Sequence, residues 1–431
     1  MQGEIKKLDL KLNEANGFII NLKDELKSTS ILFEQAKNTM GDCWPDPNAS
    51  DDVREKSTPW AHKDWLKARE EIFLAALDVH RSFIENNPSQ MLANMNLVSD
   101  WLQGKDLPED LAAIALDSLC LIVPVISTTF ASIPRMFKNI GREAIGWLLI
   151  DEAGQALPQQ AASAIWRASR TVVVGDPKQL EPVSGLPPSV EGALAKTYCV
   201  PSIWWPSEVS AQVLADQTMG LGTHLPTPDN GKVWVGCPLR VHRRCDDPMF
   251  SVSNKIAYDG LMVHGKKETH TQLPESGWID VVGKNCEGNW IVEEGEAVKK
   301  LLLELRTAYG VKPENIFLIS PFLDCAKQLR RLAAQLGFDT HKTGTVHTTQ
   351  GKEASVVVFV LGGNIQKPGA KAWAASRPNL LNVAVSRAKQ RLYVIGDRSE
   401  WKKQRYFSTL VQDLPKIEGV SPEALLAEDV L

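Results

Sequence analysis

Two short apolar runs separated by an Ala- and Gln-rich segment constrain this chain most. The runs cover residues 147–150 and 171–174, and each ends in polar residues. Short continuous apolar runs are typical of parallel strands covered on both faces. The segment over residues 155–169 has Pro158 near its start, as expected for a crossover helix. The sequence therefore predicts strand, helix and parallel strand, with polar groups at the sheet edge where α/β proteins bind ligands.

Carboxylates follow both predicted strands. Asp151 and Glu152 follow the first strand, and Asp176 follows the second. An Asp at the end of a buried strand can hold Mg²⁺, usually through water, because Mg²⁺ prefers oxygen ligands. A neighbouring Glu can orient and deprotonate a water molecule that attacks a γ-phosphate. Two solvated acids at a strand end are the alternative interpretation of this pair.

The turn after the second strand reads Gly-Asp-Pro-Lys-Gln-Leu. Its glycine turn places Gln179, whose amide can sense a γ-phosphate. With the Asp-Glu pair, this turn resembles motifs II and III of superfamily 1 helicases, in the branch of the nonsense-mediated-decay helicase and senataxin. The resemblance implies that Asp151 holds the metal, Glu152 activates water, Gln179 senses the γ-phosphate and Asp176 lies at the nucleotide.

Composition sets broad limits. The 431 residues suffice for two or three domains, and 43% hydrophobic with 23% charged residues is ordinary for a soluble globular protein. A net charge of −4 does not fit a basic nucleic-acid coat protein, although a motor that grips one strand needs only local positive charge. The seven cysteines form no Cys-x-x-Cys pair and predict reduced thiols in a cytoplasmic protein without a zinc site. No apolar run reaches membrane-spanning length.

Residues 1–40 carry an apolar stripe with alternating steps of three and four residues. Its members are Ile5, Leu8, Leu12, Ala15, Ile19, Leu22 and Leu26. This spacing predicts a coiled-coil seam. The helix either packs on its own domain or forms half of an antiparallel stalk, and we favour the stalk. Residues 41–60 are predicted as a loop, followed by helices over residues 61–83, 90–102 and 108–119.

Residues 120–127 form an apolar run that predicts a strand, and Ser127, Thr128 and Thr129 lie at its end. Small hydroxyl side chains there suit contact with a phosphodiester backbone. The segment resembles the helicase motif between the nucleotide loop and motif II, which implies nucleic-acid binding by these three residues. The same hydroxyls could also cap a helix, and the two roles are compatible.

Residues 216–232 are predicted as a loop at a domain junction, followed by a strand over residues 232–237. A basic cluster follows this strand. Three arginines within five residues suit oxyanion binding, with a solvated basic turn as the alternative. The cluster resembles motif IV, in which the usual Gln-Tyr-Arg-Met reads here His242-Arg243-Arg244-Cys245. The match implies that Arg244 is an arginine finger. The departures at His242 and Arg243 leave base and sugar contacts there open.

The segment Thr-Val-His-Thr-Thr-Gln-Gly-Lys-Glu, which begins at Thr345, resembles motif V. Gly351 permits close backbone approach, and Gln350 can bridge nucleotide to nucleic acid. The resemblance implies that Glu353 reaches the ribose and that nucleic acid is contacted by His347 and Thr348. Strands are predicted over residues 316–320 and 356–361, and a helix over residues 324–336.

Residues 378–389 resemble motif VI, ahead of a predicted strand over residues 391–396. Small residues let this helix lie close to the sheet, and the match implies that Arg387 is a second arginine facing the domain cleft. Five motifs thus follow in the family's order. From residue 401 onward the sequence predicts a polar, helical tail.

The phosphate-loop pattern Gly-x-x-x-x-Gly-Lys-Ser/Thr does not occur in the 431 residues. In the family this loop lies upstream, on the first strand of the first RecA-like domain. The resemblance covers roughly residues 115–400. It implies that the chain starts inside an insertion after the loop.

We therefore expect an α/β fold with two RecA-like parallel-sheet domains, the first incomplete, preceded by a helical coiled-coil insertion. The expected parts are residues 1–114, 115–215, 216–410 and a tail over 411–431. The resemblance implies the C-terminal portion of an ATP-dependent helicase that uses ATP and Mg²⁺ to move on a single strand of DNA or RNA. The alternative is a catalytically incomplete binding or regulatory module, or a subunit whose N-terminal partner segment carries the phosphate loop.

Overall fold

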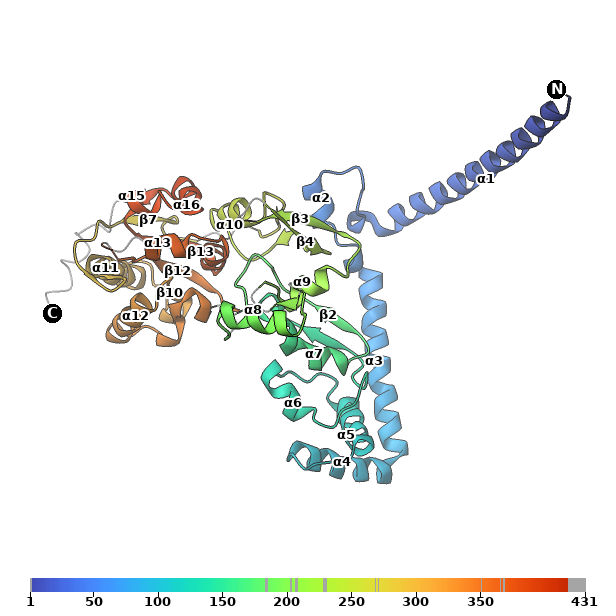
Figure 1. The fold of residues 1–431 in the computed structure, drawn as a ribbon, viewed down its shortest axis with the longest axis horizontal. Coiled ribbons are helices and arrows are strands. Elements are labelled where there is room, and N and C mark those ends of the chain that lie inside the picture. The colour runs from blue at the N-terminus through green and yellow to red at the C-terminus, as the bar shows by residue number, and fades with distance from the viewer. Residues whose placement is uncertain are drawn as a thin grey trace. The chain divides into compact units, whose positions relative to one another are not determined.

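The computed structural model describes residues 2–182, 185–201, 204–205, 208–227, 231–267, 269, 271–349, 351–364, 366 and 369–417. The side chains of residues 2–10 and of Pro188 lie outside this set. The chain forms two compact units, residues 1–88 and 89–431, and each is treated by itself (Figure 1). No described helix is long and apolar enough to cross a membrane. The domain boundaries given above remain predictions.

The first unit is helical. It contains α1 (Gln2–Met40), α2 (Asp51–Lys56) and α3 (Lys63–Asn86). The predicted N-terminal helix is confirmed as one continuous element (Figure 1). The part of its apolar stripe whose side chains are described faces solvent, since Leu12, Leu22 and Leu26 are 59%, 47% and 68% exposed. The coiled-coil partner of this stripe therefore stays a prediction.

The loop predicted over residues 41–60 is wrong in part, because it contains α2. Acidic residues in the first turn of α2 and basic residues in its last turn complement the helix dipole. Lys56 Nζ also lies 2.8 Å from Asp52 Oδ1. The helix predicted over residues 61–83 is confirmed as α3.

Helices α4 (Pro88–Leu102) and α5 (Glu109–Ile122) confirm the next two predicted helices, and α6 (Ile133–Met136) follows. The strand predicted over residues 120–127 is wrong. α5 continues to Ile122, and residues 123–129 form neither helix nor strand. A short apolar run fits helix and strand alike, and a strand also needs a neighbour for its hydrogen bonds. Within the described residues, β1 and β2 pair only with each other.

The strand, helix and strand predicted first are confirmed. They are β1 (Leu148–Ile150), α7 (Pro158–Trp166) and β2 (Thr171–Val173), and the strands pair in parallel. α7 packs on one face, where Ile150 and Ala161 are buried. The expectation that both faces are covered is wrong, because Leu149 is 72% and Val172 38% exposed. We call residues 109–216 the first lobe.

Residues 188–236 form α8 (Pro188–Thr197), α9 (Ala211–Asp216) and the antiparallel strands β3 (Gly222–Pro226) and β4 (Lys232–Gly236). β4 confirms the strand predicted over residues 232–237. The loop predicted over residues 216–232 is wrong, because it contains β3. The Gly and Pro residues of this segment indicate turns, but every residue of β3 lies opposite a residue of β4, and the backbone hydrogen bonds of this antiparallel pair hold β3 as a strand.

The second lobe, residues 241–417, holds a six-stranded sheet ordered β11-β10-β12-β13-β7-β14, with every pair parallel. Its strands are β7 (Gly277–Asp280), β10 (Ile316–Ser320), β11 (Thr343–Thr345), β12 (Ala354–Val360), β13 (Ala388–Gly396) and β14 (Lys416–Ile417). Shorter pairs are β5 (Val241–His242) with β6 (Val263–His264), and β8 (Cys286–Glu287) with β9 (Trp290–Ile291). The predicted strands at 316–320, 356–361 and 391–396 are confirmed.

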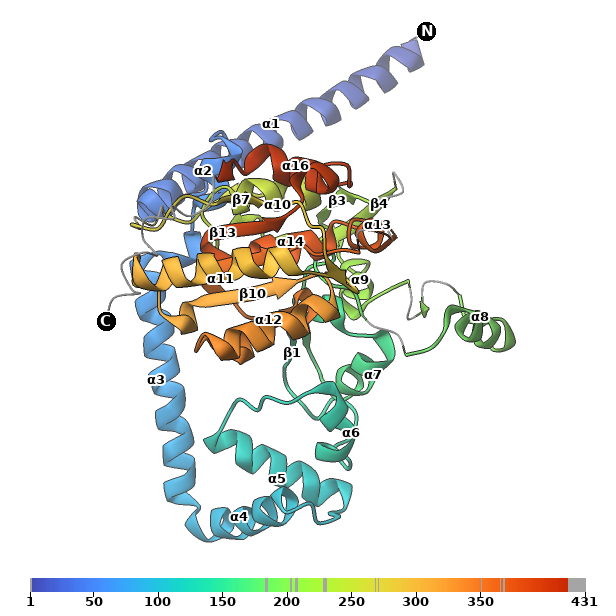
Figure 2. The same ribbon diagram turned by 90° about the vertical axis from the view of Figure 1, so that its left-hand side faces the viewer.

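Helices cover both faces of this sheet. They are α10 (Met249–Ala257), α11 (Val292–Thr307), α12 (Leu323–Gln335), α13 (Gly369–Ala374), α14 (Asn379–Ser386), α15 (Arg398–Trp401) and α16 (Phe407–Asp413). α11 and α12 lie beside β10 (Figure 2). Residues of β10 alternate between two core clusters: Phe317 packs in one and Leu318 in the other. The predicted α/β class, the parallel sheet and the long N-terminal helices are thus confirmed.

The tail predicted from residue 401 contains a helix as expected, α16, but the prediction that it is polar is wrong for its described part. Trp401, Phe407 and Leu410 are fully buried in one of the two core clusters. The last two of these lie three residues apart on one face of α16, which explains their joint burial. Residues 418–431 of the predicted tail lie outside the described residues.

Two glycines bring the ends of β1 and β2 together. A Cβ atom on Gly175 would lie 2.7 Å from the Gly154 backbone nitrogen and 2.9 Å from that of Ala153. A Cβ atom on Gly154 would lie 2.8 Å from the Asp176 carbonyl oxygen. Backbone cannot yield as a flexible side chain does. Glycine is therefore required for the two strand ends to meet.

We expect Gly175→Ala to lower the free energy of unfolding by about 1–3 kcal/mol, because the added methyl group overpacks backbone atoms. Urea denaturation of the full chain measures this change. Gly146→Ala is the matched control, since nothing lies within 4 Å of a Cβ at Gly146, and its effect should stay within about 0.5 kcal/mol. Equal effects of the two substitutions would contradict the close approach.

Candidate functional site

The polar residues predicted after β1 are Asp151 and Glu152, and both lie at the strand end. The Asp151 side chain is exposed, and its Oδ1 accepts a hydrogen bond from the Glu152 backbone nitrogen at 2.9 Å. Glu152 has φ = 53°, in the left-handed region that few non-glycine residues adopt. Its Oε2 accepts from Gln155 Nε2 at 3.3 Å. Such backbone strain is common at functional sites.

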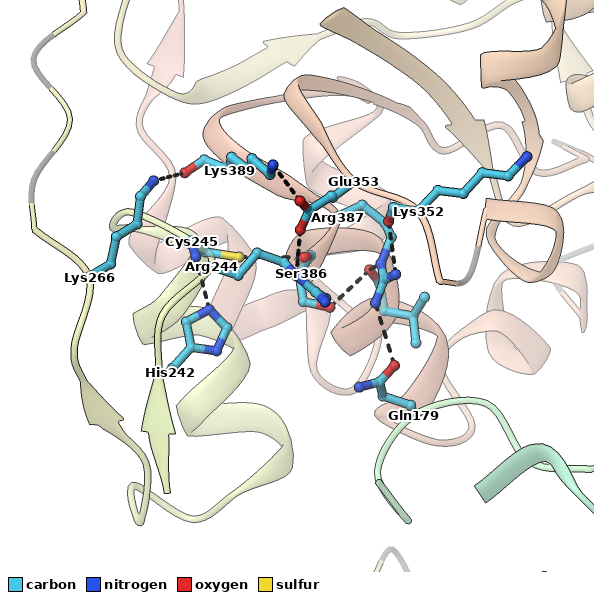
Figure 3. Close-up of polar contacts among 11 residues, drawn as sticks. Gln179, His242, Arg244, Cys245, Lys266, Lys352, Glu353, Ser386, Arg387 and Lys389 are labelled. Carbon is cyan, nitrogen blue, oxygen red and sulfur yellow. Dashed lines mark hydrogen bonds and ion pairs between the residues drawn. The ribbon is translucent and has the colours of Figure 1, made fainter. Parts of the chain in front are cut away.

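The turn after β2 is organised by the Asp176 carboxylate. Its Oδ1 accepts from the Lys178 backbone nitrogen at 2.8 Å, and its Oδ2 accepts from Gln179 Nε2 at 3.1 Å. Because the Gln179 amide donates to Asp176, its Oε1 is left to accept from Arg387 Nη2, at 3.4 Å (Figure 3). This contact joins the first lobe to the second. The structure thus brings together two residues that the sequence predicted for one site.

Arg387 follows α14 and is only 1% exposed. Its Nη1 donates to the Lys352 carbonyl at 2.9 Å and its Nε to the Val383 carbonyl at 3.3 Å. Burial lowers the pKa of Arg387, and the charge of Arg244 lowers it further, while Glu152 acts in the opposite direction. A guanidinium nevertheless keeps its charge in proteins. Arg387 is thus a buried cation within electrostatic reach of the acid after β1.

Glu353 lies between two cations of the second lobe. Arg244 Nε is 3.0 Å from Glu353 Oε2, and Lys389 Nζ forms an ion pair with Oε1 (Figure 3). The hydrogen bond from Lys389 is the main cause that lowers the pKa of Glu353, with Arg244 adding to it. Lys389 was not among the predicted site residues, although it lies two positions after Arg387. The predicted ribose contact of Glu353 remains a prediction.

His242 holds the turn that carries Arg244. Its Nε2 accepts from the Cys245 backbone nitrogen at 3.0 Å (Figure 3). Burial is the main cause that lowers the pKa of His242 to about 4, and the charges of Arg244, His264 and Lys266 add to it, while Asp247 opposes it. The neutral imidazole is the form that can accept this bond. His242 therefore has a structural role in this turn.

The predicted nucleic-acid contacts lie on the surface. Ser127, Thr128 and Thr129 are exposed. Thr129 takes the N-cap position of the short helix Phe130–Ser132, but its side chain makes no capping hydrogen bond there. Thr129 therefore has the position of a helix cap but does not make the hydrogen bond of one.

In the motif V segment, His347 and Thr348 are exposed, and Thr348 Oγ1 donates to the Thr345 carbonyl at 2.9 Å. Gly351 has φ = +75°, and nothing lies within 4 Å of a Cβ placed there, as close backbone approach requires. Gln350 lies outside the described residues.

Asp151 is the candidate ligand for a metal ion at this site. Among the described residues, no group of three or more His, Cys, Asp or Glu could hold a metal ion. Mg²⁺ in phosphate-transfer sites is commonly held by one or two carboxylates, with water and substrate phosphates completing its shell. The exposed Asp151 carboxylate fits that role. A bound Mg²⁺ would neutralise charge on the phosphates.

Three residues that sequence reasoning missed contact the turn after β2. They are Tyr258, Asn379 and Asn382, from α14 and the end of α10. The two asparagines stand out as amides in an otherwise apolar helix. Nothing in the local sequence points to the tyrosine.

Two AAA-domain family models match the chain, AAA_11 over residues 109–184 and AAA_12 over residues 236–399. The DNA replication ATP-dependent helicase/nuclease DNA2 of Gallus gallus is 25% identical over 288 residues, which cover 65% of this chain and 26% of that protein. The chain is homologous to the helicase domains of superfamily 1.

The superfamily 1 relatives are distant. An uncharacterised ATP-dependent helicase of Mycoplasma pneumoniae, the MG140 homologue, is 23% identical over 64% of this chain and 25% of its own length. The chain spans about a quarter of the length of the curated relatives it matches. A solved complex of arterivirus nonstructural protein 10, a helicase, with DNA aligns over 60% of this chain and 41% of that chain at 15% identity. Its TM-score of 0.31 does not establish a shared fold.

The low pKa of His242 predicts acid sensitivity. Because the unfolded histidine titrates near 6.5 and the folded one near 4, its contribution to stability is complete above pH 6.5 and is lost as the pH falls toward 4. Between pH 7 and 5 the loss is on the order of 1–2 kcal/mol. Denaturant unfolding at both pH values should show a smaller loss for His242→Gln, which keeps an acceptor. The same pH dependence in both chains would contradict the buried neutral imidazole.

Proposed function

We propose that this chain forms part of an ATP-dependent superfamily 1 helicase motor, with nucleotide bound between two RecA-like lobes. The observation that carries the proposal is the contact of Gln179 in the first lobe with Arg387 in the second. A γ-phosphate between these side chains would interact with both of them. Hydrolysis would then change how the lobes are held, which is what a stepping motor needs.

Each predicted residue has a role in this proposal. Asp151 holds Mg²⁺, Glu152 activates water, and the two arginines stabilise the charge that develops on the transferred phosphate. Asp176 orients Gln179. The ribose contact belongs to Glu353, with Gln350 and Gly351 beside the nucleotide.

Single-stranded nucleic acid is the proposed track. The exposed hydroxyl groups of residues 127–129, with His347 and Thr348, supply contacts to its backbone. Placement in the branch of the nonsense-mediated-decay helicase and senataxin rests on the five motifs, and the cytoplasmic location rests on cysteine usage. Both are parts of the proposal.

A second function is favoured by a specific observation. The 431 residues lack a phosphate-loop pattern, and β2 has an outer edge that is unpaired among the described strands. Residues of β2 line a cavity of about 1030 Å³. In it, the buried Asp216 Oδ2 and Gln212 Oε1 have no hydrogen-bond partner. An added strand would pair with the edge of β2, and a hydrogen-bond donor at its end would bond to these two oxygens. We therefore propose that a separate segment supplies the phosphate loop there.

Steady-state ATP hydrolysis tests the proposal. Loss of one preorganised donor can cost about 3 kcal/mol in the transition state, and a phosphate loop provides several. We therefore expect the 431-residue chain to hydrolyse ATP no faster than Glu152→Gln. Fluorescence anisotropy should show that both chains still bind labelled single-stranded DNA or RNA, with affinity that falls as salt rises.

The two measurements have separate consequences. Turnover that rises with a single strand and disappears in Glu152→Gln would contradict the need for a separate segment and support the motor. Absence of single-strand binding at low salt would contradict the motor itself.

A further inference from the structure

The second lobe contacts the turn after β2 through several residues besides Arg387. Asn382, from α14, donates through Nδ2 to the Lys178 carbonyl at 2.9 Å. Asn379, one turn earlier, donates to the Gln179 carbonyl. Both asparagines are at least nine-tenths buried, and so is Lys178. Two backbone carbonyls of the first lobe therefore depend on amides of one helix in the second.

Tyr258 adds a side-chain contact to the same turn. It follows α10, and its hydroxyl group donates to Asp176 Oδ2. The same hydroxyl oxygen accepts from Asn382 Nδ2 at 2.9 Å. Burial raises the pKa of Tyr258 well above its usual value, and the negative charge of Asp176 raises it further. The phenol thus stays protonated and keeps its role as a donor.

These hydrogen bonds form a closed ring between the lobes. Asp176 Oδ2 receives both the Tyr258 hydroxyl and the Gln179 amide, and Gln179 Oε1 in turn faces Arg387. Arg387 and Asn382 belong to the same helix and its C-cap. The ring therefore begins at Asn382 on α14, continues through Tyr258, Asp176 and Gln179, and closes at Arg387, the C-cap of α14.

We propose that Tyr258 and Asn382 are positioning residues that latch the turn after β2 to α14. The latch orients Gln179 through Asp176, so that a change at Gln179 reaches Arg387 through a fixed connection. Neither residue touches the reacting atoms. The inference rests on the proposed function for its role in turnover, whereas the latch itself concerns only the contacts between the lobes.

Hydrogen–deuterium exchange of the full chain tests the latch without any need for turnover. In Tyr258→Phe, peptides over residues 174–182 should exchange about tenfold faster, because Asp176 loses a donor and Asn382 loses an acceptor. Peptides over β12 should not change. Tyr393→Phe is the matched control, because the Tyr393 hydroxyl donates to the Pro274 carbonyl at 2.8 Å, within the second lobe. It should leave residues 174–182 unchanged.

Equal protection of residues 174–182 in Tyr258→Phe and the unaltered chain would overturn the latch. Asn382→Ala is the second variant, and it should loosen the same peptides by removing the bonds to Lys178 and Tyr258. Circular dichroism confirms that each variant is folded. Faster exchange of residues 174–182 in Tyr393→Phe would also overturn the proposal, since the effect would then not be specific to the junction.

A kinetic test separates positioning from general stability. In a preparation that hydrolyses ATP, Tyr258→Phe should lower kcat about tenfold with little change in KM, because the latch orients groups that act in the transition state. Tyr393→Phe should leave both values unchanged. A tenfold rise in KM with unchanged kcat would overturn the positioning role. Failure of the motor proposal appears as absent single-strand binding at low salt, and the exchange experiment stands independently of it.

Discussion

The insertion of the turn after β2 into the second lobe is the interaction on which the site depends. Leu180, at the end of that turn, is 6% exposed and belongs to the core cluster that contains Met249 and Leu381. Burial of one leucine side chain is worth about 1.5–3 kcal/mol, and the amides of α14 satisfy the neighbouring carbonyls. Apolar packing and hydrogen bonds thus hold the same few residues. Gln179 meets Arg387 because its neighbours are anchored in this way.

The charges at the junction follow from this packing. A buried guanidinium is costly unless its hydrogen bonds are satisfied, and Arg387 meets that need with two carbonyls and the Gln179 amide oxygen. An uncharged side chain of similar shape would avoid the cost. Retention of a cation here is consistent with the anionic nucleotide of the proposed motor. Glu353 keeps Arg244 at the same junction through an ion pair.

The sequence predicted the parts of the fold that local patterns determine. The apolar strands of the second lobe were correctly assigned because parallel strands buried by helices read as continuous apolar runs. The run of residues 147–150 with its two acids was also correctly assigned, although only one face of β1 is covered. Residues 120–127 carry the same signal and form no strand. Whether such a run becomes a strand depends on a neighbour far away in sequence, which composition does not reveal. The strand β3 was missed for the converse reason. Its composition indicates turns, but pairing with β4 holds it as a strand.

The candidate site shows the same division. Gln179 and Arg387 could be predicted because each lies in a motif with a recognisable order. Lys389 and Tyr258 were missed, because their partners lie elsewhere in the chain. Pairing of β12 with β13 brings Lys389 to Glu353, and Tyr258 meets Asp176 because the turn after β2 lies against the end of α10. The burial of Phe407 and Leu410 on α16 was missed for the same reason.

The most direct test of the central claim is the distance between the lobes, measured by double electron–electron resonance. Spin labels at Gln159→Cys on α7 and Lys327→Cys on α12 occupy exposed positions, in a chain whose five cysteines that are not buried are replaced by Ser. The account predicts one narrow distance distribution, which broadens when Tyr258→Phe and Asn382→Ala are combined. Equal widths with and without these two substitutions would contradict the claim that the turn after β2 holds the lobes together.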